Sequence, residues 1–114
     1  MSAPGTYTVE ITLDAQADLE EIHAYISEHD SERAADHVID EIESAGLKLS
    51  IFPEKGSVPA EMLDLGIRDY RQTSWKAYRL IYRIVDAKVY IYVIGDGDGR
   101  QDFRTLLMRR LLSA

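Results

Sequence analysis

The first quarter of the chain changes from a strand pattern to a helix pattern. In residues 6–13, apolar side chains occupy every second position, which predicts a half-buried strand. Asp14 can cap a following helix that ends near His29, and Asp18 is expected on its solvent side. The helix itself is predicted because apolar residues recur at helical spacing at Ala15, Leu19, Ile22 and Ile26.

A second helix follows almost at once. Asp30 and Ser31 both offer a cap, and an apolar residue then recurs every three or four positions as far as Leu49. Pro53 prevents further continuation. The two helices therefore predict an antiparallel hairpin, and residues 53–66, which hold two prolines and two glycines, predict a connection within one domain.

The second half of the chain is rich in strand patterns. Three runs, residues 67–75, 77–85 and 88–94, carry strand-like apolar periodicity, and the last two are joined by Asp86 and Ala87 as in an antiparallel hairpin. A glycine-rich loop and an amphipathic helix over residues 102–112 complete the chain. The fold class predicted is α+β in one domain over residues 1–114: an antiparallel sheet of about four strands, with the helical hairpin on one face and a short C-terminal helix.

The composition is that of a compact protein in a reducing compartment. Of the 114 residues, 46% are hydrophobic, and none is cysteine, so neither a disulfide framework nor a thiolate metal site can form. No apolar run reaches the length of a membrane helix, and the N-terminus lacks the pattern of an export signal. We therefore expect a cytoplasmic protein without membrane contact.

Charge divides the chain into two unlike halves. Residues 1–64 carry 15 acids and 3 bases, and residues 65–114 carry 5 acids and 10 bases, so the halves have charges of −12 and +5 within a total of −7. The basic half contains the three strand runs. This division predicts that the helical hairpin and the sheet face different partners.

Arginines gather on one side of the predicted central strand. Because neighbouring strand residues point to opposite faces, Arg79 and Arg83 share a face, and Tyr78, Leu80, Tyr82 and Ile84 share the other. A basic, concave sheet that faces away from the helices is thus predicted, and such a cluster suits RNA cleavage because cations stabilise charge on a phosphate. The alternative is a solvated face on which these arginines pair with Asp69. Further cations that could join the face are Arg68, Arg71, Lys76 and Arg100.

Other patterns predict no cofactor and no metal. The run Asp96-Gly97-Asp98-Gly99 lacks the glutamate that a calcium loop needs at its twelfth position, and the glycines do not form the dinucleotide fingerprint. Trp75 and Tyr70 are interpreted as core residues in preference to base-stacking ones. Three histidines have no spacing that fits a ligand set: His23, His29 and His37.

In this order, the segments resemble the RelE/ParE toxin superfamily. The resemblance rests on the helix sequence Asp-Leu-Glu-Glu-Ile-His-Ala-Tyr-Ile at residues 18–26, the Ala34-Ala35 pair, and the exit of the second helix over residues 49–53. It also rests on Tyr-Arg-Leu-Ile-Tyr-Arg at residues 78–83 and on the following strand at 89–94. Membership implies a toxin with a cognate antitoxin, encoded next door, which folds against it and forms a hetero-oligomer.

The resemblance leaves two targets open. RelE-like members cut mRNA on the ribosome, which would make Arg79, Arg100 and Arg71 catalytic, and ParE-like members bind DNA gyrase without being nucleases. The C-terminal segment lacks the tyrosine or histidine of the nucleases, and the helical hairpin is long, so the ParE-like function is favoured and enzymatic activity stays undecided. Target or phosphate contacts are then expected at Arg68, Lys76 and Arg83, and antitoxin contacts at Leu106, Leu107 and Leu111.

Overall fold

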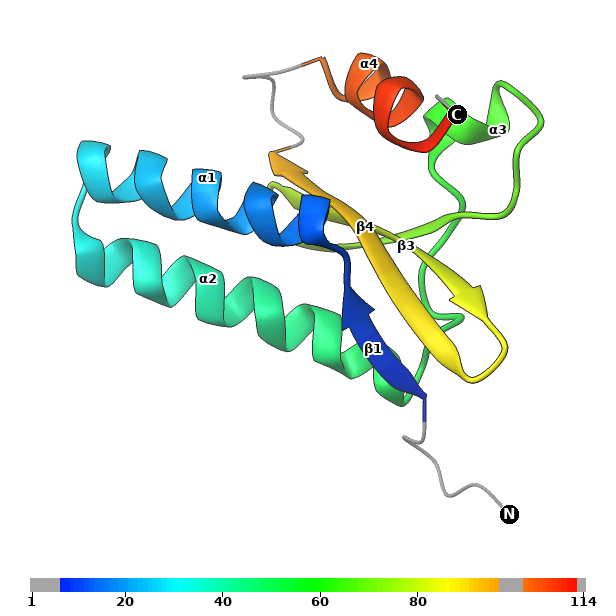
Figure 1. Ribbon diagram of the computed structural model, residues 1–114, viewed down its shortest axis with the longest axis horizontal. Coiled ribbons are helices and arrows are strands. Elements are labelled where there is room, and N and C mark those ends of the chain that lie inside the picture. Colours follow the sequence, from blue (N-terminus) through cyan, green and yellow to red (C-terminus); the bar gives the residue numbers. More distant parts are fainter. Residues whose placement is uncertain (1–6, 97–101, 113–114) are drawn as a thin grey trace.

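A computed structural model describes residues 7–96 and 102–112. The chain forms β1 (Thr8–Ile11), the long helices α1 (Leu13–His29) and α2 (Glu32–Leu47), the 3₁₀ turn η1 (Lys48–Ser50) and the short helix α3 (Ala60–Leu63). The strands β2 (Arg71–Trp75), β3 (Tyr78–Val85) and β4 (Lys88–Asp96) follow. Helix α4 (Phe103–Leu107) then continues into the π-helix η2 (Met108–Leu112) (Figure 1). The predicted α+β class and the helical hairpin are confirmed.

The sheet is mixed, which corrects the expected antiparallel arrangement. In the described part of the chain its order is β1-β4-β3-β2, and β2, β3 and β4 are antiparallel neighbours. Strand β1 runs parallel to β4, with Thr8 opposite Lys88 and Ile11 opposite Ile91. An alternating pattern specifies which side chains are buried but not the direction of the neighbouring strand. The sequence pattern of β1 therefore fitted both directions equally well.

Side-chain caps set the starts of the two long helices. The Thr12 hydroxyl accepts a hydrogen bond from the Ala15 amide at 3.2 Å, so Thr12 is the N-cap of α1 and the predicted cap, Asp14, lies in its first turn. Ser31 caps α2 by accepting from the Ala34 amide at 3.0 Å, as predicted. Asp30 ends α1.

The larger core lies between the hairpin and the sheet, on what we call the hairpin face. It combines the apolar stripe of α1 and α2 with inward side chains of β3 and β4, of which Tyr82 is the largest fully buried. The other buried members are Ala15, Leu19, Ile22, Ile42, Leu49, Leu80, Val89, Ile91 and Ile94. These positions are the apolar stripes that the sequence predicts.

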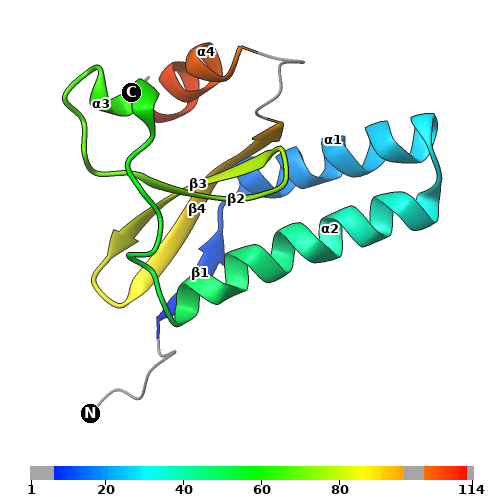
Figure 2. The same cartoon turned by 180° about the vertical axis from the view of Figure 1, so that it is seen from behind.

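The opposite side of the sheet, which we call the second face, is covered in part by α3 and α4. Met62 of α3 and Phe103 and Leu107 of α4 are buried against Ile81 and Val93 of the sheet. The sequence pattern did not predict α3 or its packing on the sheet. It indicated an open basic surface on this face instead. Figure 2 shows the chain running from α2 along the sheet to α3 before it returns as β2. Packing of apolar side chains on the second face explains the difference, because Ile81 and Val93 would otherwise be exposed.

An irregularity in β4 adjusts which residues reach the second face. Ile81 is opposite Val93, but its neighbour Tyr82 is opposite Ile91, so Tyr92 is an extra residue in β4. Such a β-bulge shifts the alternation of side chains by one position. As a result, the adjacent residues Tyr92 and Val93 both pack in the second-face core, while Ile91 and Ile94 belong to the hairpin-face core.

Candidate functional site around Arg79

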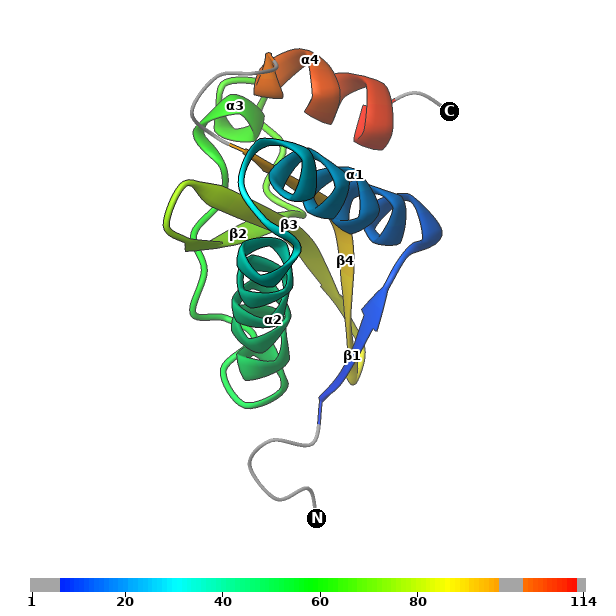
Figure 3. The same cartoon turned by 90° about the vertical axis from the view of Figure 1, so that its left-hand side faces the viewer.

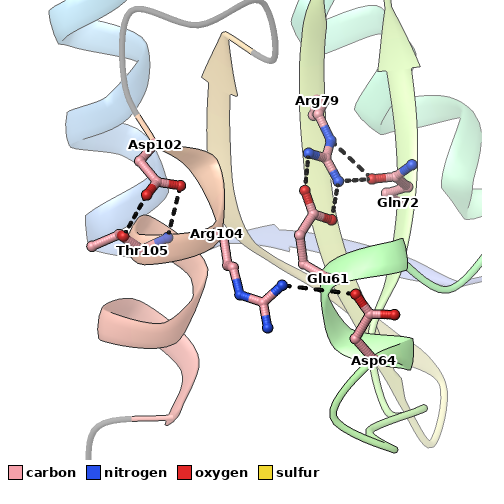
Figure 4. Close-up of polar contacts among 7 residues, drawn as sticks. All are labelled: Glu61, Asp64, Gln72, Arg79, Asp102, Arg104 and Thr105. Carbon is pink, nitrogen blue, oxygen red and sulfur yellow. Dashed lines mark hydrogen bonds and ion pairs between the residues drawn. The ribbon is translucent and has the colours of Figure 1, made fainter.

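Arg79 lies at the centre of a polar cluster on the second face. Strand alternation places its side chain on the same face as Ile81, beneath the loop that carries α3. Its guanidinium donates two parallel hydrogen bonds to the Glu61 carboxylate, from Nη1 to Oε2 at 2.8 Å and from Nη2 to Oε1 at 2.9 Å. It also donates from Nε to Gln72 Oε1 at 2.9 Å and from Nη2 to the same oxygen (Figure 4). Three segments of the chain thus meet at one side chain.

These contacts occupy four of the five N–H donors that a guanidinium has. The pair is also shielded, since only 17% of the Arg79 side chain and 23% of the Glu61 side chain are exposed. The hydrogen bond from Arg79 lowers the pKa of Glu61 despite the opposing effect of burial. Arg79 is therefore a neutralised structural cation in this arrangement, without the two free parallel donors that would bind a phosphate.

Helix α4 adds an aromatic contact to the cluster around Arg79. The centre of the Arg79 guanidinium lies 4.1 Å from the centroid of the Phe103 ring, which is a close cation–π contact. Asp102 caps the helix through the Thr105 amide at 3.4 Å and hydroxyl at 2.8 Å, and these hydrogen bonds lower the Asp102 pKa. The capped helix start thus fixes Phe103 over Arg79. A second link joins α4 to the end of α3, where Arg104 Nη1 lies 3.7 Å from Asp64 Oδ2 (Figure 4).

Arg71, which the sequence grouped with Arg79, lies on the other side of the sheet. It is opposite Tyr82 in the β2–β3 register, and Tyr82 belongs to the hairpin face. Its Nη1 donates to the carbonyls of Glu54 and Gly56 at 3.2 and 2.7 Å. The Tyr82 hydroxyl donates to the Pro53 carbonyl at 2.6 Å and accepts from the Gly56 amide at 3.0 Å, and its burial raises its pKa. Both side chains hold the loop at residues 53–56.

The other predicted contact residues are dispersed. Arg83 lies 3.9 Å from Asp69 and 6.0 Å from the centroid of the Tyr70 ring, with 43% of its side chain exposed. The pairing of Arg83 with Asp69 was the alternative predicted from the sequence. Arg68 is exposed, Lys76 lies in the β2–β3 turn with its ammonium 5.1 Å from the Trp75 ring, and Arg100 is outside the described residues. The structure therefore brings no two of these arginines together as a phosphate site among the described residues.

The leucines predicted to bind an antitoxin contribute to this chain's own core on the second face. Leu107 is fully buried, and Leu106 and Leu111 pack around the same cluster. Their helix is tied to α1 by Arg110, which donates to both carboxylate oxygens of Asp18 at 3.1 Å and to the Tyr92 carbonyl at 2.9 Å.

Asp18 is buried, which corrects its predicted place on the wet side of α1. It also accepts a hydrogen bond from the Ile94 amide at 2.9 Å, so it satisfies both a buried backbone group and a cation. The sequence contained an indication of this position, because Asp18 is three residues after Ala15 and four before Ile22, within the apolar stripe.

Among the residues that the structure describes, no group of three or more histidine, aspartate or glutamate side chains is arranged to hold a metal ion. No helix in residues 7–96 and 102–112 has the length and hydrophobicity needed to cross a membrane.

Two solved structures that match this arrangement come from toxin–antitoxin systems. The chromosomal ParDE toxin–antitoxin system from P. aeruginosa matches with a TM-score of 0.68 and 16% sequence identity, over 81% of this chain and 97% of the matched chain. The RelBE2 toxin–antitoxin complex from Mycobacterium tuberculosis matches with a TM-score of 0.59 and 21% identity, over 82% and 94%. At these identities the likeness establishes the fold.

The sequence comparison is more specific. No curated protein matches the chain significantly. A family model described as the ParE toxin of the type II toxin–antitoxin system parDE matches residues 9–103. This range includes both long helices, strands β2 to β4, all of β1 except Thr8, and Arg79. The chain therefore belongs to the ParE toxin family of type II toxin–antitoxin systems.

Proposed function

We propose that this toxin acts in the bacterial cytoplasm by binding an essential target, DNA gyrase, and that it does not cleave RNA. An antitoxin encoded by the adjacent gene neutralises it in a hetero-oligomeric complex. Membership of the ParE family and the likeness to the P. aeruginosa ParDE toxin support this proposal.

The main structural support for gyrase rather than RNA as the target is that the Arg79 guanidinium is already hydrogen-bonded within the protein. Cleavage of RNA by its 2′-hydroxyl requires cations that are free to stabilise the charge growing on the phosphate. Here Glu61 and Gln72 take four donors of Arg79, and Arg71 faces the other side of the sheet. A toxin that works by surface contact needs no such cluster.

The test is tightly controlled expression without the neighbouring gene. We expect growth to stop, with an SOS response and gyrase-trapped DNA breaks, while mRNA stays intact for the first minutes. Rapid cleavage of mRNA at mapped positions would instead assign the chain to the RelE-like nucleases. Unaffected growth would contradict its action as a toxin.

A variant separates the two mechanisms further. In Arg79→Lys, the charge remains but the paired donors to Glu61 are lost, so a nuclease built on Arg79 would lose its cutting activity. For the proposed mechanism we expect toxicity to persist at a level set by the amount of folded protein, which circular dichroism and immunoblotting would measure. Arg104→Lys, at an arginine that is 50% exposed and lies 3.7 Å from Asp64, is the matched control, because an exposed ion pair contributes little stability.

A further inference from the structure

An apolar slot opens on the hairpin face, between β1 and the C-terminal half of α2. It has a volume of about 290 Å³ and is lined mostly by aliphatic side chains, among them Val9, Ile11, Ile42 and Leu47. Gly46 brings α2 close to the sheet here, since a Cβ at that position would lie 3.0 Å from Ile91 Cδ1. The slot therefore leads from the surface to the edge of the larger core.

The rim of this slot exposes apolar side chains that a lone domain would be expected to cover. Leu47 is 63% exposed and Ile11 37% exposed, although both belong to elements that build the core. Just beyond, Ile51 and Phe52 follow the end of α2 and are 48% and 66% exposed. Exposed apolar side chains at the mouth of an apolar slot are typical of a binding site for another polypeptide.

Strand β1 presents an unpaired edge beside the slot. The Thr8 and Thr12 amides donate to the Ala87 and Ile91 carbonyls of β4, so strand alternation directs the intervening Val9 and Ile11 amides away from β4. In the described residues, β1 is the last strand of the sheet on that side (Figure 3). An open edge with free backbone donors is a template for one more strand.

The charge around the slot indicates the chemistry of the occupant. The two flanking segments, residues 8–14 and 39–48, hold five acids and one base, Lys48. Glu43 itself lines the slot. Complementarity therefore favours a segment that carries lysine or arginine beside its apolar side chains.

We infer that the slot and the free edge of β1 receive an extended segment of the antitoxin, which adds a fifth strand beside β1. Its apolar side chains enter the slot between β1 and α2, and its cations contact the acidic rim at Glu43. The inference rests on the proposed neutralisation by an antitoxin and locates it away from Leu106, Leu107 and Leu111, which already pack in the toxin's own core.

The first experiment measures amide hydrogen exchange of the purified toxin, alone and with the polypeptide encoded by the adjacent gene. The inference predicts that the Val9 and Ile11 amides exchange at least about 100-fold more slowly in the complex, because they gain hydrogen bonds. The Thr8 amide, already bonded to β4, is the internal control and changes less. A stable complex in which Val9 and Ile11 exchange as in the free toxin would overturn the inference.

The second experiment fills the slot's rim with a charge. Leu47→Lys puts a cation where a cationic segment should dock, and Leu63→Lys, at a leucine of α3 that is 42% exposed, is the matched control. Leu47→Lys should weaken binding of the neighbour-encoded polypeptide by about 50-fold or more, and Leu63→Lys should leave it within about threefold. Thermal unfolding establishes that both variants fold.

Growth assays distinguish a failure of the proposed function from a failure of the slot inference alone. We expect Leu47→Lys to stay toxic but to escape rescue by the co-expressed neighbour, whereas Leu63→Lys is rescued. If wild-type toxin is harmless or never binds the neighbour's product, the proposed function fails; if it is toxic and both variants are rescued alike, only the slot inference fails. A wild-type dimer that Leu47→Lys dissociates, or a copurified aliphatic molecule seen by native mass spectrometry, would assign the slot to that occupant instead.

Discussion

Replacing Glu61 by glutamine removes the charge that neutralises Arg79 while keeping the shape of the side chain. The bidentate pair of 2.8 and 2.9 Å would become at most one neutral hydrogen bond, and a guanidinium that is only 17% exposed would lose its counter-charge. Breaking a buried pair costs about 3–5 kcal/mol, and the remaining amide contact with access to some water reduces this to roughly 2 kcal/mol. For a chain of this length, that loss corresponds to a decrease in Tm of about 8 °C.

The effect must also depend on pH in a defined direction. The pKa of Glu61 in the folded protein lies below its ordinary value of 4.5, so the pair contributes its full stability above that value. The contribution is lost as the pH falls through the lower, folded pKa. Urea unfolding followed by circular dichroism should therefore show a larger unfolding free energy for wild type than for Glu61→Gln at pH 7, with the difference shrinking as the pH falls below 4.5. Equal stabilities at pH 7, or a gap that acid leaves unchanged, would refute this reasoning.

A matched control is the neighbouring ion pair between Asp64 and Arg104. It is longer, 3.7 Å, and its side chains are 68% and 50% exposed. Exposed pairs contribute little, so Asp64→Asn should change the unfolding free energy by less than about 0.5 kcal/mol at any pH.

Three further substitutions test other parts of the structure by the same unfolding measurement. Asp18→Ala leaves the Ile94 amide and Arg110 without their buried acceptor and should cost about 3 kcal/mol, whereas Asp14→Ala, whose carboxylate is 72% exposed, should cost little; equal effects would contradict the buried role of Asp18. Tyr82→Phe should cost about 1–2 kcal/mol at pH 7. Because burial raises the Tyr82 pKa in the folded state, wild type should also lose stability as the pH rises above 10 and through that raised pKa, and the variant should lack this component. Leu107→Ala should cost about 2–5 kcal/mol and Leu112→Ala much less, since Leu107 is fully buried and Leu112 is 40% exposed; the reverse order would show that α4 is not part of the core.

The parts of the fold that the sequence predicted are those with strong local periodicity. Apolar residues at every third or fourth position predict the two long helices, and apolar residues at every second position predict the β3–β4 hairpin. Ser31 and Asp102 act as helix caps because their side chains accept hydrogen bonds from nearby backbone amides. Helix α3 has four residues, too few for a periodic pattern, and it lies in a stretch that its prolines and glycines marked as a connection. The direction of β1 depends on its distant partner β4, which alternation alone does not encode.

The difference between local pattern and tertiary contact also explains which features of the Arg79 cluster the sequence predicted. Strand alternation correctly placed Arg79 and Arg83 on one face, yet the partner of Arg79 is Glu61, eighteen residues earlier in the connection. Only the tertiary position of α3 brings that carboxylate to the strand. Arg71 was grouped with Arg79 because both are strand arginines, but the pairing of Arg71 with Tyr82 turns it to the hairpin face. Charge along a sequence therefore indicates a basic region without indicating which cations are neutralised.

The parallel pairing of β1 with β4 has a consequence for how the chain is made. Thr8 lies opposite Lys88, so the sheet joins two segments that are about 80 residues apart in the sequence. The helical hairpin is built from local contacts that can form during synthesis, whereas closing so large a loop is entropically costly and slow. On the ribosome, the nascent first strand must wait for residues 88–91 to emerge before the larger core can close around Val89 and Ile91. Every property that needs the closed sheet is thus acquired only after residues 88–91 have been synthesised and released from the ribosome.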